Sequence, residues 1–316
     1  MNLISGASGF IGKRLLRALL LEKEPCRVLS RNSVPNGMGC IADLADEFAL
    51  LSACEGVHTV FHCAGHAHAF SSLSGDDAAM HWRVNFEGTR NLIEAAGKAG
   101  VKTFVFLSSV KAMAEPGNVC AAEDFSGDPE TAYGQSKLAA EKVVLATGKR
   151  YGMHVVNLRL AMVYGLGGRG NLERMGLLVK RGWFPPLPET GNRRSLVHVD
   201  DVVVAMRLVA DDHRAFGKTY IIASKDAPSG RSLFNALRKA QGLSNCSWSV
   251  PASLLHFLAG LSDGVEALLK RRLPFDTEVL DRLLRSAWYS PGSIEGDLGW
   301  RANVSLNDGL REMMLK

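Results

Sequence analysis

The sequence lacks the features that mark membrane-spanning and secreted proteins. No uncharged apolar stretch reaches the roughly 18 residues of a transmembrane helix. The chain begins MNLISGASG, and no positively charged segment precedes this short apolar run, so we expect no secretory signal peptide. The six cysteines form no C-x-x-C pair, and several lie in or beside apolar runs. We therefore predict reduced, mostly buried thiols in a cytoplasmic protein.

The sequence also lacks a large excess of charge of either sign. Its net charge of +5 at pH 7 is too small to favour a nucleic-acid partner. Most of this excess lies between residues 165 and 194, where a net charge of +4 comes from Arg169, Arg174, Lys180, Arg181, Arg193 and Arg194 against Glu173 and Glu189. A compact basic segment fits a small anionic ligand better than a long polyanion, which would need an extended basic face.

The composition is that of a globular protein. Hydrophobic residues make up 47% of the 316 residues and charged residues 22%, which excludes a disordered or fibrous chain. The N-terminal half alternates short branched apolar runs with helical spacing. We expect strands at residues 1–5, 27–30, 57–63, 102–108 and 154–160, and helices at residues 11–21, 83–99 and 133–147. This alternation predicts an α/β Rossmann fold with a doubly wound parallel sheet, which binds ligands beyond the carboxyl ends of its strands.

The pattern changes after residue 165, where glycine, proline and basic residues dominate. The segment SLVHVDDVVVAMRLVA then indicates a return to the sheet followed by a helix, and the chain is helical and loop-rich from residue 251. We predict an NAD(P)-binding domain at residues 1–165, to which residues 195–225 return. Residues 166–194 and 226–316 are expected to form a smaller substrate-binding lobe.

A glycine-rich turn predicts the cofactor. Gly6, Gly9 and Gly12 follow the first expected strand, in the sequence GASGFIG, and open the first expected helix. Gly6 permits a tight turn, Gly9 lets the backbone approach a pyrophosphate, and Gly12 lets the helix pack close to the strand. The free N–H groups of the helix N-terminus then face the phosphates. An ordinary strand-to-helix turn is the alternative.

The end of the second expected strand predicts which dinucleotide binds. An acid about 20 residues after the glycines would hold the ribose 2′-hydroxyl of NAD(H). Ser30 and Arg31 stand here instead, and an arginine pairs with a 2′-phosphate. We favour NADP(H) over NAD(H), with a solvated loop cation as the alternative for Arg31. Asp43 is either a partner of the adenine amino group or a helix N-cap.

Tyr133 and Lys137 predict proton transfer. In YGQSK they stand four residues apart, on one face of an expected helix. A tyrosine is a poor base at its reference pKa of about 10. A neighbouring ammonium and an oxidised nicotinamide ring would lower that pKa, so that the pair can move a proton to or from an alcohol. A hydroxyl of Ser108 or Ser109, at the end of the preceding strand, could hydrogen-bond the reacting oxygen.

These motifs together resemble one family over nearly the whole chain. The chain resembles the extended short-chain dehydrogenase/reductases, in the NAD(P)-dependent sugar-nucleotide epimerase/dehydratase/reductase branch. The similar segments are GASGFIG, VFHCAG, VNFEGTRNLIEAA, FVFLSSVKA, YGQSKLAAE, LRLAMVYG, RRSLVHVDDV and LGW. The resemblance implies that Tyr133 transfers the proton and that Lys137 orients the ribose and polarises Tyr133. It also places the catalytic hydroxyl at Ser109.

The resemblance assigns further residues to the two ligands. It implies cofactor contacts from Phe10, Ile11, Cys63, Ala64 and Asn85, besides the glycines. It implies substrate contacts from Ser109, Asn171 and Arg194, with Arg194 on the substrate diphosphate. We expect a nucleotide-sugar substrate and a homodimer that pairs through residues 82–99 and 133–147.

One departure from the family pattern narrows the reaction. The 4,6-dehydratases of the family need an Asp-Glu pair after the strand-end hydroxyl, and this chain has Val110 and Lys111. The SSVK sequence is closer to bacterial polysaccharide 4-epimerases and 4-keto reductases. We predict a C4 epimerase of UDP-hexose or UDP-N-acetylhexosamine in surface polysaccharide biosynthesis. The alternatives are an NADPH-dependent reductase of a UDP-4-keto-6-deoxy-hexosamine, a reductase of small carbonyls and an inactive dinucleotide-binding sensor.

Two weaker features complete the sequence predictions. His62, His66 and His68 stand close together, but the resemblance places their loop beside the cofactor, so we predict no metal site. Residues 251–273 are largely apolar and include Lys270, Arg271 and Arg272 near their end. We favour a core helix with a solvated basic end, and keep peripheral membrane contact, with a polyprenyl-diphosphate-linked sugar as substrate, as the alternative.

Overall fold

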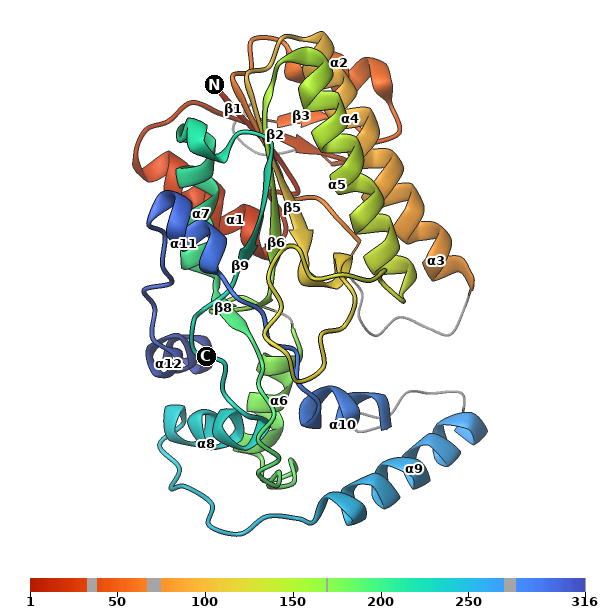
Figure 1. Ribbon diagram of the computed structural model, residues 1–316, viewed down its shortest axis with the longest axis vertical. Helices are drawn as coiled ribbons and strands as arrows, with labels where there is room; N and C mark the ends of the chain where they lie inside the picture. Colours follow the sequence, from red (N-terminus) through yellow and green to blue (C-terminus); the bar gives the residue numbers. More distant parts are fainter. Residues whose placement is uncertain (33–38, 67–74, 169, 270–276, 316) are drawn as a thin grey trace.

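A seven-stranded parallel sheet forms the centre of the protein (Figure 1). The computed structural model describes residues 1–32, 39–66, 75–168, 170–269 and 277–315. The strands are β1 (Asn2–Ser5), β2 (Cys26–Ser30), β3 (Gly39–Ile41), β4 (Thr59–His62), β5 (Thr103–Ser109), β6 (His154–Leu160) and β9 (Lys218–Ile222). Their order is β3-β2-β1-β4-β5-β6-β9, and each adjacent pair is parallel. The direction of winding reverses between β1 and β4, so the predicted doubly wound Rossmann sheet is confirmed.

Alternating apolar residues of the strands cover both faces of this sheet. Ile4 and Val105 point to the face that carries α1 (Phe10–Leu21) and α7 (Val199–Asp211). Leu3 and Phe104, their chain neighbours, belong to the core on the other face. The helices of that face are α2 (Glu47–Cys54), α4 (Gly88–Lys98) and α5 (Ala132–Tyr151). Because neighbouring side chains of a strand face opposite ways, apolar runs such as FVFL bury both faces.

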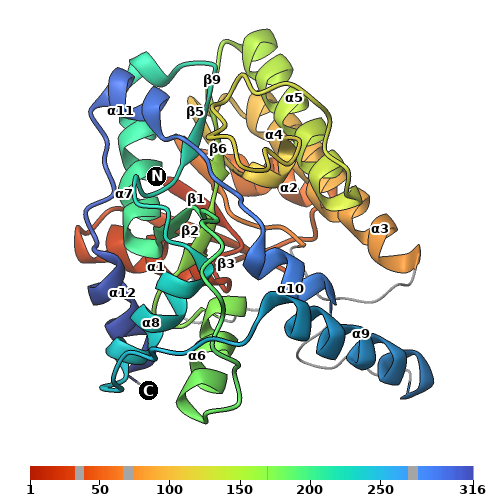
Figure 2. The same cartoon turned by 60° about the horizontal axis from the view of Figure 1, so that its bottom comes forward.

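Five further helices of the described residues pack around a second core. They are α6 (Asn171–Lys180), α8 (Gly230–Ala240), α9 (Ala252–Leu269), α10 (Thr277–Leu284) and α12 (Leu306–Met314), whereas α11 (Gly292–Leu298) lies against the main sheet's core. Figure 1 shows α6, α8 and α9 below the strands of the main sheet, and Figure 2 shows α9 at the edge of the molecule. None of the helices within the described residues combines the length and apolar content needed to cross a bilayer.

Two local predictions need correction. The segment SLVH does not rejoin the main sheet: β8 (Leu196–His198) pairs with β7 (Met162–Tyr164) in a separate two-stranded sheet, and β9 joins β6 instead. The expected helix at residues 83–99 is interrupted as well. It begins as α3 (Gly75–His81), continues as a π-helical segment, Trp82–Glu87, and becomes α helical again in α4. Such π segments occur frequently at functional sites.

A buried ion pair fastens α5 to the sheet. Arg159 of β6 donates from Nε and Nη2 to both carboxylate oxygens of Glu141, at 2.8–3.2 Å. The Ser108 hydroxyl donates to the same carboxylate at 2.5 Å. The side chains of Arg159 and Glu141 are 11% and 3% exposed, so almost no water compensates either charge. The arrangement links one helix to the adjacent strands β5 and β6.

Removing one charge of this pair should destabilise the fold. Glu141→Gln leaves the Arg159 guanidinium buried without a counter-ion, so we expect the free energy of unfolding in urea to fall by about 3–5 kcal/mol. The double variant Glu141→Gln/Arg159→Met should recover part of that loss. Losses under about 1 kcal/mol in both single variants, Glu141→Gln and Arg159→Met, would contradict this account.

Candidate active site

The glycine-rich turn has the shape of a phosphate cradle. Gly6 has a φ of 72°, and its carbonyl accepts a hydrogen bond from the Gly9 N–H at 2.9 Å. A Cβ on Gly12 would lie 2.3 Å from the Gly6 oxygen, and one on Gly6 would lie 2.6 Å from the Ala64 nitrogen. Both positions therefore exclude side chains. Phe10 and Ile11 form the first turn of α1, and Gly9, its N-cap, supplies no side-chain cap, so the first N–H groups suit a pyrophosphate.

A chain of hydrogen bonds holds the loop after β4 against this turn. The Ser5 hydroxyl and His62 Nδ1 are 2.6 Å apart, and His62 Nε2 and the Thr89 hydroxyl are 2.9 Å apart. Thr89 donates to the Asn85 carbonyl, so His62 donates from Nε2 and accepts at Nδ1. Burial lowers the pKa of His62 to about 3. His62 is therefore a neutral connector between Ser5 of β1 and Thr89 of α4. The Ala64 N–H donates to the Ser5 hydroxyl at 3.2 Å.

Asn85 connects this loop to α5. It is fully buried in the π-helical segment. Its Oδ1 accepts from the His66 N–H at 2.8 Å, and its Nδ2 donates to the His66 carbonyl at 3.0 Å and to the Ser136 hydroxyl at 3.3 Å. Asn85 thereby fixes the backbone that follows Cys63 and Ala64, which the sequence assigned to the cofactor.

Lys137 lies buried at the centre of the site. Its Nζ donates to the Leu107 carbonyl of β5 at 2.9 Å and lies 4.8 Å from the centre of the Phe106 ring. A Cβ on Gly65 would lie 3.3 Å from this ammonium, so the loop passes close above it. Burial lowers the pKa of Lys137 to about 8, and the Glu141 carboxylate one helical turn away opposes that shift.

Tyr133 and Ser109 are hydrogen-bonded to each other at the ends of α5 and β5, the helix that carries Lys137 and the strand that Lys137 contacts. Tyr133 is the second residue of α5 and Ser109 the last of β5. Burial raises the pKa of Tyr133, and a hydrogen bond with the Ser109 hydroxyl opposes the increase. The sequence motif predicts a pKa lowered by neighbouring charge. The protein's own groups instead keep the phenol protonated at neutral pH.

Sequence reasoning missed His81, which lies next to Tyr133, and Asp77, which lies next to His81. The His81 ring lies edge-on to the Tyr133 ring, with the centres 5.4 Å apart. Asp77 lies 4.0 Å from His81 Nε2 and 2.9 Å from His66 Nε2. The spacing of Asp77, His81 and Asn85 at every fourth residue was the available signal. The three groups of His66, Asp77 and His81 lie within 4.8 Å of one another, a spacing open to a metal ion. His68, from the same predicted cluster, is outside the described residues.

The residues expected around the adenosine are exposed. Arg31 follows β2 and is accessible to solvent. Asp43 is also exposed, and its Oδ1 accepts from the Ala45 N–H at 2.9 Å. The alternative that Asp43 is a helix N-cap is wrong, because Asp46 caps α2 through the Ala49 N–H.

The residues expected around the substrate lie on the other lobe. Asn171 is the exposed first residue of α6. Arg194 is half-buried, and its guanidinium donates to the Arg285 carbonyl at 3.4 Å. The basic segment 165–194 divides between two places. Arg193 lies over the Trp288 ring, whereas Arg181 lies over the Trp183 ring beyond the end of α6. Arg169 is outside the described residues.

Comparisons with known proteins agree with this geometry. A sequence model described as "NAD dependent epimerase/dehydratase family" matches residues 2–223. A UDP-glucose 4-epimerase of Vibrio cholerae is 28% identical over 322 residues, covering 98% of this chain and 93% of that protein. A 2-alkyl-3-oxoalkanoate reductase of Stenotrophomonas maltophilia (strain K279a) is 26% identical over 327 residues, covering 98% of this chain and 97% of that protein.

A solved structure extends the agreement to three dimensions. The UDP-glucose 4-epimerase of Thermus thermophilus in complex with NAD is 26% identical and superposes with a TM-score of 0.73, covering 99% of this chain and 97% of that one. The family resemblance and the fold class predicted from the sequence are therefore confirmed.

The buried ammonium predicts a pH dependence of stability. Because the fold lowers the pKa of Lys137 from 10.5 to about 8, the unfolded chain binds more protons here between those values. Raising the pH through this window therefore removes the destabilising contribution of the Lys137 ammonium to the folded protein. We expect the free energy of unfolding of the wild type, relative to Lys137→Met, to rise by up to ~3 kcal/mol from about pH 7.5 to about pH 10.5 without added dinucleotide.

The control for this experiment is Lys142→Met, which removes an exposed lysine of the same helix. Its difference from the wild type should stay constant over the same range. A flat difference for Lys137→Met would show that the folded protein does not disfavour the ammonium.

Proposed function

Since the chain belongs to the NAD dependent epimerase/dehydratase family, we propose that it is a sugar-nucleotide C4 epimerase. The observation that carries this proposal is the Tyr133–Ser109 pair at the end of β5, next to the buried Lys137 and the glycine cradle. A hydroxyl pair and an ammonium at the carboxyl edge of the sheet suit the oxidation and reduction of an alcohol carbon.

The residues present fit a nicotinamide dinucleotide. Gly6, Gly9 and Gly12 leave backbone space for a pyrophosphate, and Gly65 leaves space next to the Lys137 ammonium. When bound there, the dinucleotide accepts and returns the hydride. Lys137 is held by the Leu107 carbonyl, so it can point an N–H at a ribose hydroxyl from a fixed position.

Tyr133 supplies the proton chemistry. With the dinucleotide as hydride acceptor, the deprotonated Tyr133 oxygen would take the proton of the C4 hydroxyl in the first half-reaction. After the 4-keto sugar has rotated in the site, Tyr133 would return that proton to the C4 oxygen in the second half-reaction, as the hydride is added to the other face. Because burial raises the pKa of Tyr133, its deprotonation needs added positive charge, which an oxidised nicotinamide ring carries.

The groups after Ser109 argue against a dehydratase. Water elimination requires an acid and a base at this position. Val110 is buried, and the Lys111 ammonium pairs with Glu115. Neither Val110 nor Lys111 therefore carries the acid and base of an elimination, which leaves oxidation and reduction at one carbon.

We propose a UDP-hexose or UDP-N-acetylhexosamine as the substrate, with a role in surface polysaccharide synthesis. The UDP-glucose 4-epimerases among the relatives support the nucleotide. We propose that Arg194, a half-buried cation, contacts the diphosphate, and that Asn171, at the exposed start of α6, contacts the sugar nucleotide. The SSVK sequence supports the polysaccharide role.

Incubation with candidate sugars tests the proposal. We expect wild-type protein with NAD⁺ to convert UDP-glucose or UDP-N-acetylglucosamine to its C4 epimer without net consumption of dinucleotide. Tyr133→Phe should lower kcat by a factor of about 10²–10⁴, the contribution of a positioned general acid–base. The dinucleotide Kd should change little, because the lost hydroxyl faces the substrate. Activity equal in Tyr133→Phe and wild type would reject the assignment.

A reductase is the second candidate, supported by Arg31 and by the relative described as a 2-alkyl-3-oxoalkanoate reductase. Stoichiometric NADPH consumption with a UDP-4-keto-6-deoxy-hexosamine would favour it over an epimerase. Consumption with a small ketone, together with no thermal stabilisation by UDP, would favour a reductase of small carbonyls. Because Tyr133 and Lys137 are both present, an inactive sensor has the least support.

Arg31 tests the choice of dinucleotide. If its guanidinium pairs with the 2′-phosphate, Arg31→Ala should weaken NADP(H) binding by about 1.5–3 kcal/mol, as for other hydrogen bonds to charged groups. The Kd of NAD(H) should hardly change. Calorimetric titration measures both constants, and Arg17→Ala, an exposed arginine of α1, is the matched control. Equal losses for both dinucleotides would show that Arg31 does not contact the phosphate.

A homodimer and a cytoplasmic location complete the proposal. The helices α4 and α5 lie side by side along one flank of the sheet, as the expected dimer contact requires (Figure 1). Trp82, just before α4, is 38% exposed, which leaves apolar surface for a partner. All six cysteines are free thiols, which fits a reducing compartment.

A further inference from the structure

Large apolar side chains are exposed together at the end of the molecule formed by α6, α8 and α9. We call this surface the apolar end and define it as Trp183, Trp248, Leu254, Phe257 and Leu261. Trp183 is 73% exposed, and Trp248 and Phe257 are each 63% exposed. In Figures 1 and 2, α9 lies at the edge of the molecule, away from the seven-stranded sheet. Exposed apolar patches of this kind mark interaction sites.

The helix α9 is apolar on two faces. Leu255 and Ala259 are fully buried in the second core. Leu254, Phe257 and Leu261 are spaced by three and four residues, so they form one stripe, and all three are exposed. A surface helix of a monomer normally presents polar residues outward. The outward stripe of α9 therefore suits an apolar or interfacial environment better than water.

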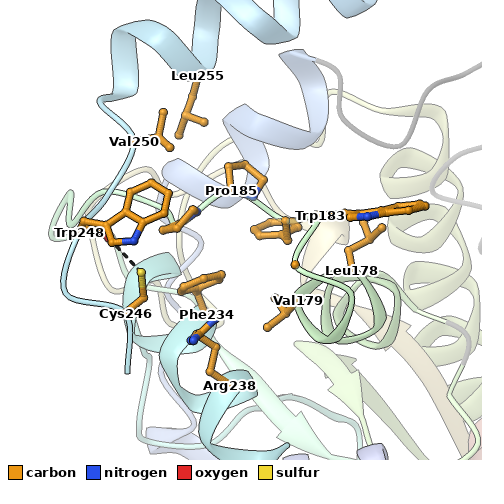
Figure 3. A pocket seen from close by; sticks show the side chains of 13 residues that line it. Leu178, Val179, Trp183, Pro185, Phe234, Arg238, Cys246, Trp248, Val250 and Leu255 are labelled. Atoms are coloured by element: carbon orange, nitrogen blue, oxygen red, sulfur yellow. Dashed lines mark hydrogen bonds between the residues drawn. The ribbon is translucent and has the colours of Figure 1, made fainter. Parts of the chain in front are cut away.

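A cavity opens between the two exposed tryptophans. Its volume is about 620 Å³, and Trp183 and Trp248 lie on opposite sides of it (Figure 3). Most other lining side chains are apolar, and Arg238 is the charged one among the lining residues. Replacing the water in such a cavity with hydrocarbon is favourable, because it removes apolar surface from water.

Basic residues predominate around the apolar end, although Asp263 and Glu266 follow within α9 and Asp281 Oδ1 of α10 lies 3.9 Å from His256 Nδ1. Residues 177–186 and 231–261, which line the cavity and carry the apolar end, contain five basic residues and no Asp or Glu: Lys180, Arg181, Arg231, Arg238 and Lys239. Their sum equals the net charge of +5 of the whole chain. Lys180, Arg181 and Lys239 are exposed, and the Arg181 guanidinium lies 5.8 Å from the centre of the Trp183 ring.

We propose that the apolar end docks on the surface of an anionic phospholipid bilayer. Indole rings prefer the boundary between headgroups and hydrocarbon, and lysine and arginine next to them pair with the phosphates. A second protein copy would place five like charges against five like charges, whereas an anionic lipid surface neutralises them. Lys270, Arg271 and Arg272, the basic residues of the sequence-based membrane alternative, lie outside the described residues and carry no part of this proposal.

Vesicle co-sedimentation tests the proposal without reference to catalysis. We expect the full-length protein to pellet with vesicles of phosphatidylcholine containing about 30% phosphatidylglycerol, and to stay in the supernatant with pure phosphatidylcholine. The triple variant Trp183→Ser/Trp248→Ser/Phe257→Ser should bind at least ten-fold more weakly. Phe48→Ser is the matched control, because Phe48 of α2 is 88% exposed but lies far from α9 (Figure 1). It should bind like the wild type.

A set of charge variants separates the electrostatic contribution from packing. Lys180→Gln, Arg181→Gln and Lys239→Gln should each lower the vesicle partition coefficient about five-fold, the equivalent of about 1 kcal/mol per cation near an anionic surface. Circular dichroism and dinucleotide binding check that each variant is folded. Failure of the wild type to bind anionic vesicles at low salt, or equal binding to neutral ones, would overturn the proposal. A triple variant that binds anionic vesicles like the wild type would also overturn it. The same holds if light scattering shows that the triple variant has lost a dimer while its vesicle binding is unchanged, because the apolar end would then be a contact between protein copies.

Discussion

The buried pair of Glu141 and Arg159 is the interaction on which the site's geometry depends. Tyr133, Lys137 and Glu141 stand at successive fourth residues of α5, so they form one stripe facing β5. Glu141 anchors that stripe to Arg159 and Ser108, and Lys137 reaches the Leu107 carbonyl one residue before Ser108. Because two charges without water tolerate little displacement, the helix cannot slide along the strand. Tyr133 is thereby held opposite Ser109.

The features predicted from the sequence are those that depend on local spacing. Gly6, Gly9 and Gly12 were recognisable because a tight turn and a close helix contact each exclude a side chain at a defined distance along the chain. Tyr133 and Lys137 were recognisable because a four-residue spacing puts two side chains on one helical face. The strand β5 was recognisable because a parallel strand buried on both faces is a continuous apolar run.

The features that were missed depend on contacts between distant parts of the chain. Arg159 of β6 pairs with Glu141 of α5, and Asn85 hydrogen-bonds the backbone of His66. Because the partners lie in different elements, a local sequence pattern reveals neither contact. The strand β8 has the composition of a sheet strand, but only tertiary pairing decides that its partner is β7. The increase in the pKa of Tyr133 comes from burial, which a sequence motif does not contain.

The late position of β9 in the chain has a consequence for synthesis. The strand β6 ends at Leu160, but its outer partner begins only at Lys218, and between them lie α6, α7 and the small sheet. Once β6 has left the ribosome and before β9 has followed, the sheet therefore ends in a strand that presents unpaired N–H and C=O groups along apolar residues. Such an edge can form backbone hydrogen bonds with strands of other chains, which promotes aggregation. Translation speed over the intervening 57 residues sets how long nascent copies on one messenger remain able to pair with each other.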